Sequence, residues 1–173
     1  MTTRTVITNA GPLMALAKLN QLHLLAELYS EVTVPHAVYT EVVTQGSARG
    51  EPDALTVRLF WNQRKWPIAT VAETHLRTYE AEATLDAGES AVLALGLTHP
   101  GCLLLLDDAV ARTEAHRLCL TVKGTLGVLA DAYRQQKLSR SQLELLFAEI
   151  AARPDIWISA TLCQQVLAGL LAG

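Results

Sequence analysis

The 173-residue sequence predicts an α/β fold with a central, mostly parallel sheet. Short β-branched or leucine-rich runs, which are typical of strands, alternate along the chain with segments of helical periodicity. One run, CLLLL at 102–106, is apolar at every position, as expected of a strand that is covered on both faces. Half of the residues are apolar but only 5% are aromatic, so aliphatic side chains are expected to build the core. No repeat or linker divides the chain, and we expect one domain over residues 1–173.

The N-terminal half predicts three strands, each followed by helical segments. RTVIT at 4–8 is β-branched, and Pro12 then marks a helix start, because proline fits the first helical turn. Pro35 has the same role after the second strand, while Pro67 places the third strand at a sheet edge. Glycines and a proline over 46–52 predict a loop. The predicted strands are 4–8, 31–35 and 66–71, and the predicted helices are 12–19 with its continuation 21–29, 36–44, 53–62 and 73–84.

The C-terminal half continues the alternation. The predicted helices are 86–97, 109–118, 124–136, 141–152 and 160–171, and the predicted strands are CLLLL at 102–106 and CLTV at 119–122. Both strands are expected to be buried. The last helix is amphipathic, and we expect it to cover the core, with contact to a partner as the alternative.

The charge balance limits the classes of function. A net charge of −3 and a pI of about 5.9 argue against a protein that coats nucleic acid by neutralising its phosphates. An enzyme acting on nucleic acid is still compatible with this charge if a metal ion supplies positive charge locally.

Targeting signals and cysteine usage predict a cytoplasmic protein. The N-terminus lacks the pattern of a signal peptide, and the apolar stretch around 91–106 is interrupted at 98–101, short of the ~20 residues that a membrane span needs. Cys102, Cys119 and Cys163 share no metal-ligand spacing and are interpreted as small buried side chains in a reducing compartment.

Acidic side chains are predicted to gather at one edge of the sheet, because open parallel sheets bind ligands at the carboxyl ends of their strands. Asn9 follows the first strand, and Asp107 and Asp108 follow CLLLL. Glu41 and Glu89 lie in the first two turns of helices that begin at the same edge. Converging carboxylates bind hard cations such as Mg²⁺ or Mn²⁺, and without a metal they repel one another and raise their pKa values. The pattern predicts a metal site for phosphoryl chemistry.

Three of these positions, Asn9, Glu41 and Glu89, also have a purely structural interpretation. Asp86 and Glu89 fit a capping box at the start of a helix. Glu41 fits an ordinary solvated position on a helix, and Asn9 fits a turn or a helix N-cap.

The doubled aspartate is harder to explain structurally. One aspartate is enough to cap the helix that follows, so Asp107 and Asp108 together point beyond capping, and Asp107 is the stronger candidate. Arg112 is expected to pair with Asp108 at i,i+4, with a phosphate as its alternative partner. Thr125, after Gly124, is a natural N-cap at a helix start whose N–H groups could hold a phosphate. Arg112 and Thr125 are therefore candidates for substrate binding.

Motifs of other chemistries are absent from the sequence. It has no HExxH, GxGxxG, CxxC or P-loop pattern, and GESAV lacks the closing glycine of a nucleophile elbow. The five histidines are scattered without ligand spacing, and His36 and His116 are expected at the surface or on a helix face. The acidic edge therefore carries the functional prediction.

Five stretches, in this order, resemble PIN-domain ribonucleases, more specifically the VapC-like toxins. They are VITNAGPLMALAKL (6–19), VTVPHAVYTEVV (32–43), LDAGESAVLALGL (85–97), CLLLLDDAVAR (102–112) and LTVKGTLGVLADA (120–132). Residues 45–80 and the C-terminal helices match only in general character. The resemblance implies a three-layer α/β/α sandwich and cleavage of RNA phosphodiester bonds that depends on Mg²⁺ or Mn²⁺ and on four acidic positions.

The four acidic positions of that family fall on Asn9, Glu41, Glu89 and Asp107. Thr125 falls where the family often has a polar residue near the site. Asn9 departs from the usual aspartate: its amide oxygen can bind a hard cation but brings no charge, which should weaken metal affinity. Asp108 would supply a substitute charge.

The leading hypothesis is a metal-dependent endoribonuclease that is the toxin of a type II toxin–antitoxin pair. Asn9, Glu89 and Asp107 would hold the metal, and Glu41 or Asp108 would complete its shell or orient water. The alternatives are a PIN-fold module that binds nucleic acid or protein without catalysis, and a phosphohydrolase of small phosphoesters. The resemblance also implies a homodimer and an antitoxin partner, for which the early helices (13–28) offer an apolar surface.

Overall fold

A computed structural model describes residues 4–80 and 85–172, and its strands form one all-parallel sheet. The order in the sheet is β3-β2-β1-β4-β5. The strands are β1 (Val6–Thr8), β2 (Val32–Pro35), β3 (Ile68–Ala69), β4 (Leu103–Leu105) and β5 (Thr121–Lys123). The predicted α/β fold with a parallel sheet is confirmed.

The sheet changes winding direction between β1 and β4. From β1 the chain adds β2 and β3 on one side, and it later returns to add β4 and β5 on the other. Val6 of β1 is therefore paired with both Val32 of β2 and Leu103 of β4. In open parallel sheets the crevice at the carboxyl ends of such neighbouring strands is the usual ligand site.

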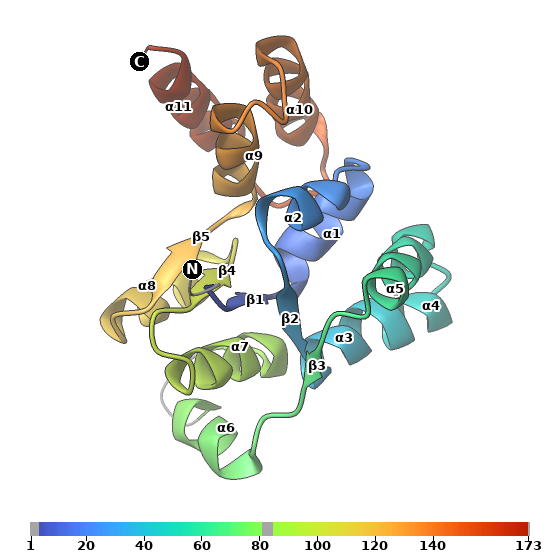
Figure 1. Cartoon of the computed structure of the whole chain (residues 1–173), viewed down its shortest axis with the longest axis vertical. Coiled ribbons are helices and arrows are strands. Elements are labelled where there is room, and N and C mark those ends of the chain that lie inside the picture. Colours follow the sequence, from blue (N-terminus) through green and yellow to red (C-terminus); the bar gives the residue numbers. More distant parts are fainter. Residues whose placement is uncertain (1–3, 81–84, 173) are drawn as a thin grey trace.

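Helices flank the sheet on both faces. Figure 1 shows α6 and α7 on one side and α1, α2 and α9 on the other, with α10 and α11 stacked beyond α9. The helices are α1 (Ala10–Lys18), α2 (His23–Leu28), α3 (His36–Tyr39), the π-helix η1 (Thr40–Gln45), α4 (Gly46–Ala48), α5 (Pro52–Arg64), α6 (Glu73–Glu80), α7 (Ala87–Leu97), α8 (Ala109–Arg117), α9 (Thr125–Arg134), α10 (Arg140–Ala152) and α11 (Ala160–Leu171).

The core is mainly aliphatic, as predicted. Ile7 and Leu104 in the sheet are fully buried, and Val92 in α7 is buried against them. Two aromatic side chains, Trp61 and Phe147, are also almost fully buried. Burial of this apolar surface is the main source of stability and holds the strand ends in fixed positions.

The first helical segment is broken where the sequence pattern predicts continuity. Asn20 has a left-handed backbone with φ of 56°, so α1 ends at Lys18 and α2 begins only at His23. Asparagine tolerates this conformation better than most residues do. Most leucines of both helices, such as Leu16 and Leu24, are fully buried, and Leu28 is partly buried against the core. The prediction of an exposed apolar surface over 13–28 is therefore wrong.

The predicted helix 36–44 has a different form and length. It runs as α3, the π-helix η1 and α4 without a break to Ala48, so 46–48 is helical and not part of a loop. The predicted helix 73–84 is seen as α6 to Glu80, and 81–84 lies outside the described residues.

The second C-terminal strand is an edge strand and is not buried as predicted. Thr121 in β5 is exposed, and Val122 and Lys123 are only half-buried, because β5 has a neighbour on one side alone. Cys119 before it is also exposed, unlike Cys102 and Cys163.

The C-terminal helix covers less of the core than expected. Cys163 is the only buried residue of α11, which packs against α10 and α9. No helix in the described part of the chain combines the length and the apolar character that a membrane crossing requires.

Candidate active site

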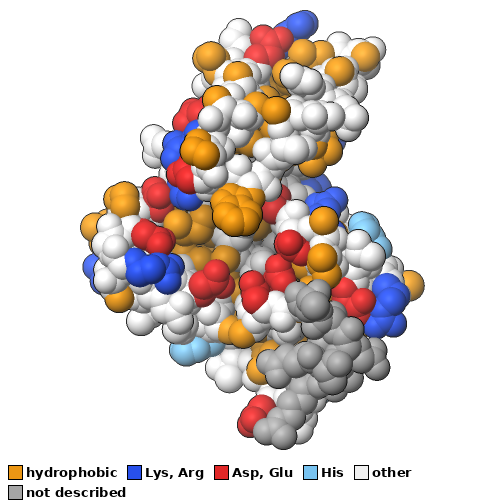
Figure 2. All heavy atoms as spheres, turned by 180° about the vertical axis from the view of Figure 1, so that it is seen from behind, with side chains coloured by type: hydrophobic (Ala, Val, Ile, Leu, Met, Phe, Trp, Pro, Cys, Tyr) orange, Lys and Arg blue, Asp and Glu red, His pale blue; other side chains and the backbone are white. Residues whose placement is uncertain are grey.

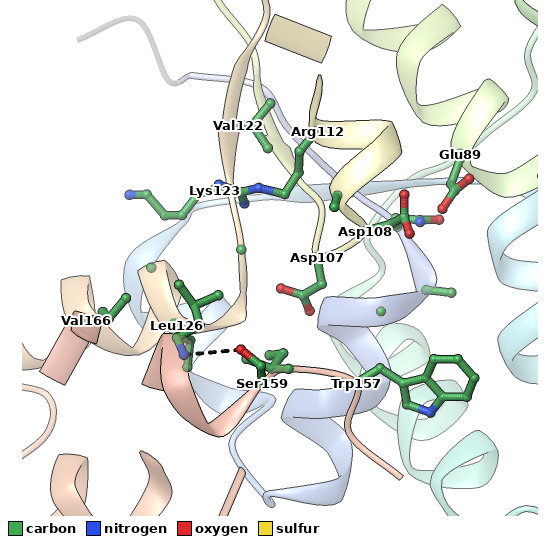
Figure 3. A pocket seen from close by; sticks show the side chains of 18 of the residues that line it. Glu89, Asp107, Asp108, Arg112, Val122, Lys123, Leu126, Trp157, Ser159 and Val166 are labelled. Atoms are coloured by element: carbon green, nitrogen blue, oxygen red, sulfur yellow. Dashed lines mark hydrogen bonds between the residues drawn. The ribbon is translucent and has the colours of Figure 1, made fainter. Parts of the chain in front are cut away.

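A cleft of about 920 Å³ lies at the carboxyl ends of β1 and β4, where the sequence analysis places the functional edge. Figure 2 shows acidic side chains gathered near a hydrophobic cluster in the middle of the face on which the cleft opens, and Figure 3 shows the cleft from close by. Six of the seven predicted site residues line it: Asn9, Glu41, Glu89, Asp107, Asp108 and Arg112.

Asn9 sits directly after β1, at the N-cap of α1. Its backbone N–H donates to the carbonyl oxygen of Leu105 at 3.0 Å, which fixes it beside the end of β4. Its side chain does not cap the helix, and it is only 6% exposed. The side-chain oxygen Oδ1 is buried without a hydrogen-bond partner among the described residues. A buried acceptor of this kind calls for a donor or a cation.

Glu41 and Asn9 converge on the start of α7. A Cβ atom placed on Gly88 would lie 3.2 Å from Asn9 Oδ1 and 3.2 Å from Glu41 Oε2. The absence of a side chain at Gly88 therefore lets both oxygens approach the same point from different elements.

Glu89 is both a helix cap and part of the acidic cluster. Its backbone N–H donates to Asp86 Oδ1 at 2.7 Å, and its Oε2 accepts from the Asp86 N–H at 3.0 Å, so the predicted capping box is confirmed. Burial raises the pKa of Glu89, and the negative charges of Asp86, Asp108 and Glu41 add to the rise, against the lowering effect of the Asp86 N–H.

Burial also raises the pKa of Glu41, and the nearby Asp86 charge adds to it, while Arg49 opposes it. Glu41 is thus not an ordinary solvated residue. Asp86 was predicted only as a cap, yet it lines the cleft and acts on both glutamates. The capping-box pattern itself could have signalled this, because the box holds Asp86 beside Glu89.

Asp107 is held by Thr125 through both carboxylate oxygens. The Thr125 backbone N–H donates to Oδ1 at 2.7 Å, and its hydroxyl donates to Oδ2 at 2.6 Å. Burial raises the pKa of Asp107, whereas these two hydrogen bonds and the Arg112 charge lower it. Thr125 is fully buried behind Asp107 as the first residue of α9, and the predicted N-cap position is taken by Gly124.

Asp108 and Arg112 do not form the predicted ion pair. Asp108 is exposed and caps α8 by accepting the Ala111 N–H at 2.9 Å. Arg112 instead donates from Nη1 to the carbonyl oxygen of Leu106 at 3.0 Å. One bond uses a small part of the donor capacity of a guanidinium, and the described residues provide its side chain with no other hydrogen-bond partner, although its charge acts on Asp107. Arg112 therefore presents free donors and a positive charge to the cleft.

The C-terminal segment forms one wall of the cleft, which the sequence analysis did not predict. Trp157, Ile158 and Ser159 from the connection between α10 and α11 line it, as do Leu162 and Val166 of α11. No spacing or motif marks these residues, because only the packing of α11 against α9 brings them to the sheet edge.

The donor chemistry of the cleft fits a hard cation held by few protein ligands. Within residues 4–80 and 85–172, no three His, Cys, Asp or Glu side chains are close enough to hold a metal by themselves. Mg²⁺ usually keeps several waters and takes only one or two protein carboxylates. Asn9 Oδ1 lacks a partner, and a cation near it would offset the repulsion that raises the pKa values of Glu41 and Glu89.

The chain matches a known protein family over almost its whole length. Residues 5–171 match the family model described as PIN domain. No curated protein matches the chain. PIN domains are typically nucleases and generally use divalent metals. A match of this extent, together with a parallel sheet whose cleft at the ends of β1 and β4 is lined by acidic side chains, shows that the chain belongs to the PIN-domain family.

Proposed function

We propose that the protein is a metal-dependent endoribonuclease that hydrolyses phosphodiester bonds of RNA. The observation that carries this proposal is the buried, unpartnered Oδ1 of Asn9 at the point where Glu41 also converges. An orphan oxygen beside carboxylates with raised pKa values suits a bound cation better than it suits any packing role.

Asn9, Glu89 and Asp107 would hold Mg²⁺ or Mn²⁺, which would supply positive charge beside the scissile phosphate. The two hydrogen bonds from Thr125 leave each Asp107 oxygen a second lone pair and fix the direction in which the carboxylate faces. Thr125 thus acts as a positioning residue.

Glu41 or Asp108 would complete the shell or orient the attacking water. We take Glu41 as the base, because burial raises its pKa above the usual 4.5, the direction that favours proton abstraction. Arg112 would bind the phosphate, since its guanidinium offers free donors from the wall of the cleft.

Cleavage of structured RNA tests the proposal directly. We expect the wild type to cleave with Mn²⁺ or Mg²⁺ and to be inactive in EDTA, and we expect Asp107→Asn to lose most activity. Glu31→Gln, which removes an exposed acid remote from the cleft, is the matched control. Equal activity of the wild type and the Asp107 variant would remove Asp107 from the mechanism.

A PIN-fold binding module without catalysis is the second candidate. Asn9 is neutral, and no three acidic side chains of the described residues are close enough to hold a metal by themselves; both facts favour it. Calorimetric titration with Mn²⁺ separates the two: micromolar binding that is lost in Glu89→Gln counts against the module, and no binding at millimolar metal favours it. A screen with small phosphoesters separates the nuclease from a phosphohydrolase of small substrates.

We also propose the toxin role, which rests on the resemblance to VapC-like proteins. Expression should arrest cell growth, and co-expression of a small protein encoded next to it should relieve the arrest. Arrest that persists unchanged in Asp107→Asn would contradict a toxic nuclease.

A further inference from the structure

Trp157 is the most exposed large hydrophobic side chain among the described residues, at 94%. Transfer of an indole into water is unfavourable, so an exposed tryptophan beside a cleft is a candidate for a contact. Figure 3 shows its ring on the same side of Asp107 as Asp108 and Glu89, and Trp157 lines the cleft.

The exposure does not come from a loose segment. Arg153 and Asp155 form two hydrogen bonds, Nε to Oδ1 at 2.9 Å and Nη2 to Oδ2 at 2.8 Å. Lys18 at the end of α1 donates to the Asp155 carbonyl oxygen at 2.7 Å and accepts from Arg153 through its own carbonyl oxygen at 3.3 Å. Ile156, the next residue, is buried in the core. The backbone before Trp157 is therefore attached to α1, and the ring is held out into solvent.

Trp157 lies between two hollows that share acidic residues. One is the cleft itself, and the second, of about 330 Å³, is lined by small residues of α1 together with Met14, Glu41 and Asp107. A flat group in the second hollow would lie against the indole, while a phosphate joined to it would reach Asp107 and the cleft.

We infer that Trp157 is a stacking platform for an unpaired nucleobase next to the scissile phosphate of the RNA substrate. The inference rests on the proposed nuclease function. Aromatic side chains stack bases that are splayed out of single strands, whereas the bases of a duplex are already stacked and paired.

The surroundings of Trp157 favour a base over a protein partner. Its neighbours Asp155 and Ser159 are exposed and polar, whereas Ile156 is buried and Ile158 half-buried, so the indole is the exposed apolar group of residues 155–159. Of the other large hydrophobic side chains that are exposed, Leu162 lines the cleft, whereas Leu145 and Val110 do not. A protein contact of high affinity needs a wider apolar surround.

Binding of a short single-stranded RNA, and of the same RNA annealed to its complement, tests the inference. Ca²⁺ replaces Mg²⁺, and a gel confirms that the RNA stays intact. Anisotropy of a fluorescently labelled RNA gives the affinity of every variant. Trp61 and Trp66 are buried, so quenching of the wild-type tryptophan fluorescence reports in addition mainly on Trp157. We expect the wild type to bind the single strand more tightly, and Trp157→Ala to weaken that binding about 5- to 150-fold, the equivalent of about 1–3 kcal/mol for one stacked base.

Trp157→Phe should keep most of the wild-type affinity, because its ring can still stack, whereas Trp157→Leu should not. Leu145→Ala, which changes an exposed site outside the cleft, is the matched control. In cleavage assays the alanine variant should raise KM more than it lowers kcat. Equal RNA binding by the wild type and Trp157→Ala, or equal binding of duplex and single strand, would overturn the inference and would favour a protein contact. If Trp157-dependent binding persists but no RNA is cleaved, the nuclease proposal fails and the stacking site stands.

Discussion

Asn9 is the residue at which this chain departs from the acidic pattern of its family, and its replacement by aspartate has opposite effects with and without metal. We expect Asn9→Asp to bind Mn²⁺ more tightly, on the order of tenfold, because it adds a full charge to a partly buried site. In EDTA the same variant should melt at a lower temperature than the wild type, since it adds repulsion to the cluster of Glu41 and Glu89.

Calorimetry with Mn²⁺ and thermal melts in EDTA provide the two measurements. Asn9→Ala, which removes Oδ1, is the companion variant and should bind Mn²⁺ more weakly than the wild type. If Asn9→Asp binds Mn²⁺ no better than the wild type does, Asn9 is not a metal ligand.

Thr125 offers a way to separate the position of Asp107 from its charge. Thr125→Val keeps the backbone N–H bond to Asp107 but removes the hydroxyl bond of 2.6 Å. We expect a loss of about 1–3 kcal/mol in the free energy of unfolding, because one buried carboxylate oxygen loses its donor, together with reduced cleavage. Thr125→Ser retains a hydroxyl and should keep wild-type stability and wild-type cleavage. Urea unfolding and RNA cleavage assays provide the two measurements. Full activity in Thr125→Val would show that the direction of Asp107 does not depend on the hydroxyl.

The sequence predicts where these side chains lie, because their placement depends on topology alone. Asn9 and Asp107 follow apolar strands of a parallel sheet, and the carboxyl ends of such strands meet whatever the details of packing. The partner of Arg112 depends instead on its side-chain rotamer, and the sequence pattern favours an ion pair with Asp108 that the structure does not form.

At the scale of the element, the start of α9 fits the end of β4 closely. A Cβ atom on Gly124 would lie 2.8 Å from Asp107 Oδ1 and 3.1 Å from Arg112 Nη1. Gly124→Ala should therefore displace both groups and reduce RNA cleavage at least tenfold, with a loss of about 1–3 kcal/mol in stability from overpacking. Gly169→Ala in α11 is the control, because nothing lies near its Cβ position and alanine favours a helix by about 1 kcal/mol. Unchanged cleavage by Gly124→Ala would mean that Asp107 and Arg112 can move without cost.

Elements whose form depends on tertiary packing are the ones that the sequence does not predict. The apolar spacing of Val38 and Val42 predicts a helix, but not the π-helix that turns Glu41 toward Gly88. π-helical turns often occur at functional sites. Similarly, the apolar run at 119–122 looks buried, and only the strand order shows that β5 is an edge.

At the scale of the whole molecule, the two ends of the chain build one site. Asn9 and the start of α1 provide one side of the cleft. Trp157 and α11 provide another wall, for which the sequence pattern predicts no functional role. The ion pair of Lys18 with Asp155, 3.3 Å apart, links these two regions directly. The C-terminal helices thus shape the cleft as well as pack on the core.

The acidic cluster also makes the stability of the whole molecule depend on pH and metal in a defined direction. Glu41 and Glu89 have pKa values raised above 4.5 in the folded protein. Above pH 4.5 and up to these raised values, the folded state binds more protons than the unfolded state, so stability falls as pH rises through this window. The double variant Glu41→Gln, Glu89→Gln lacks both carboxylates and is the reference. In EDTA, the melting temperature of the wild type should therefore fall relative to that of this variant as pH rises from about 4.5 toward neutral.

Mn²⁺ should reverse this trend in the wild type, because a ligand that binds only the folded state at 100 times its Kd adds about 2.7 kcal/mol of stability. Glutamine retains the capping box of Glu89, so the double variant should fold and should respond little to Mn²⁺. Parallel melting curves of the two proteins across this pH range, or equal stabilisation of both by Mn²⁺, would show that repulsion in the cleft is not relieved by a cation and that these glutamates are not part of a metal site.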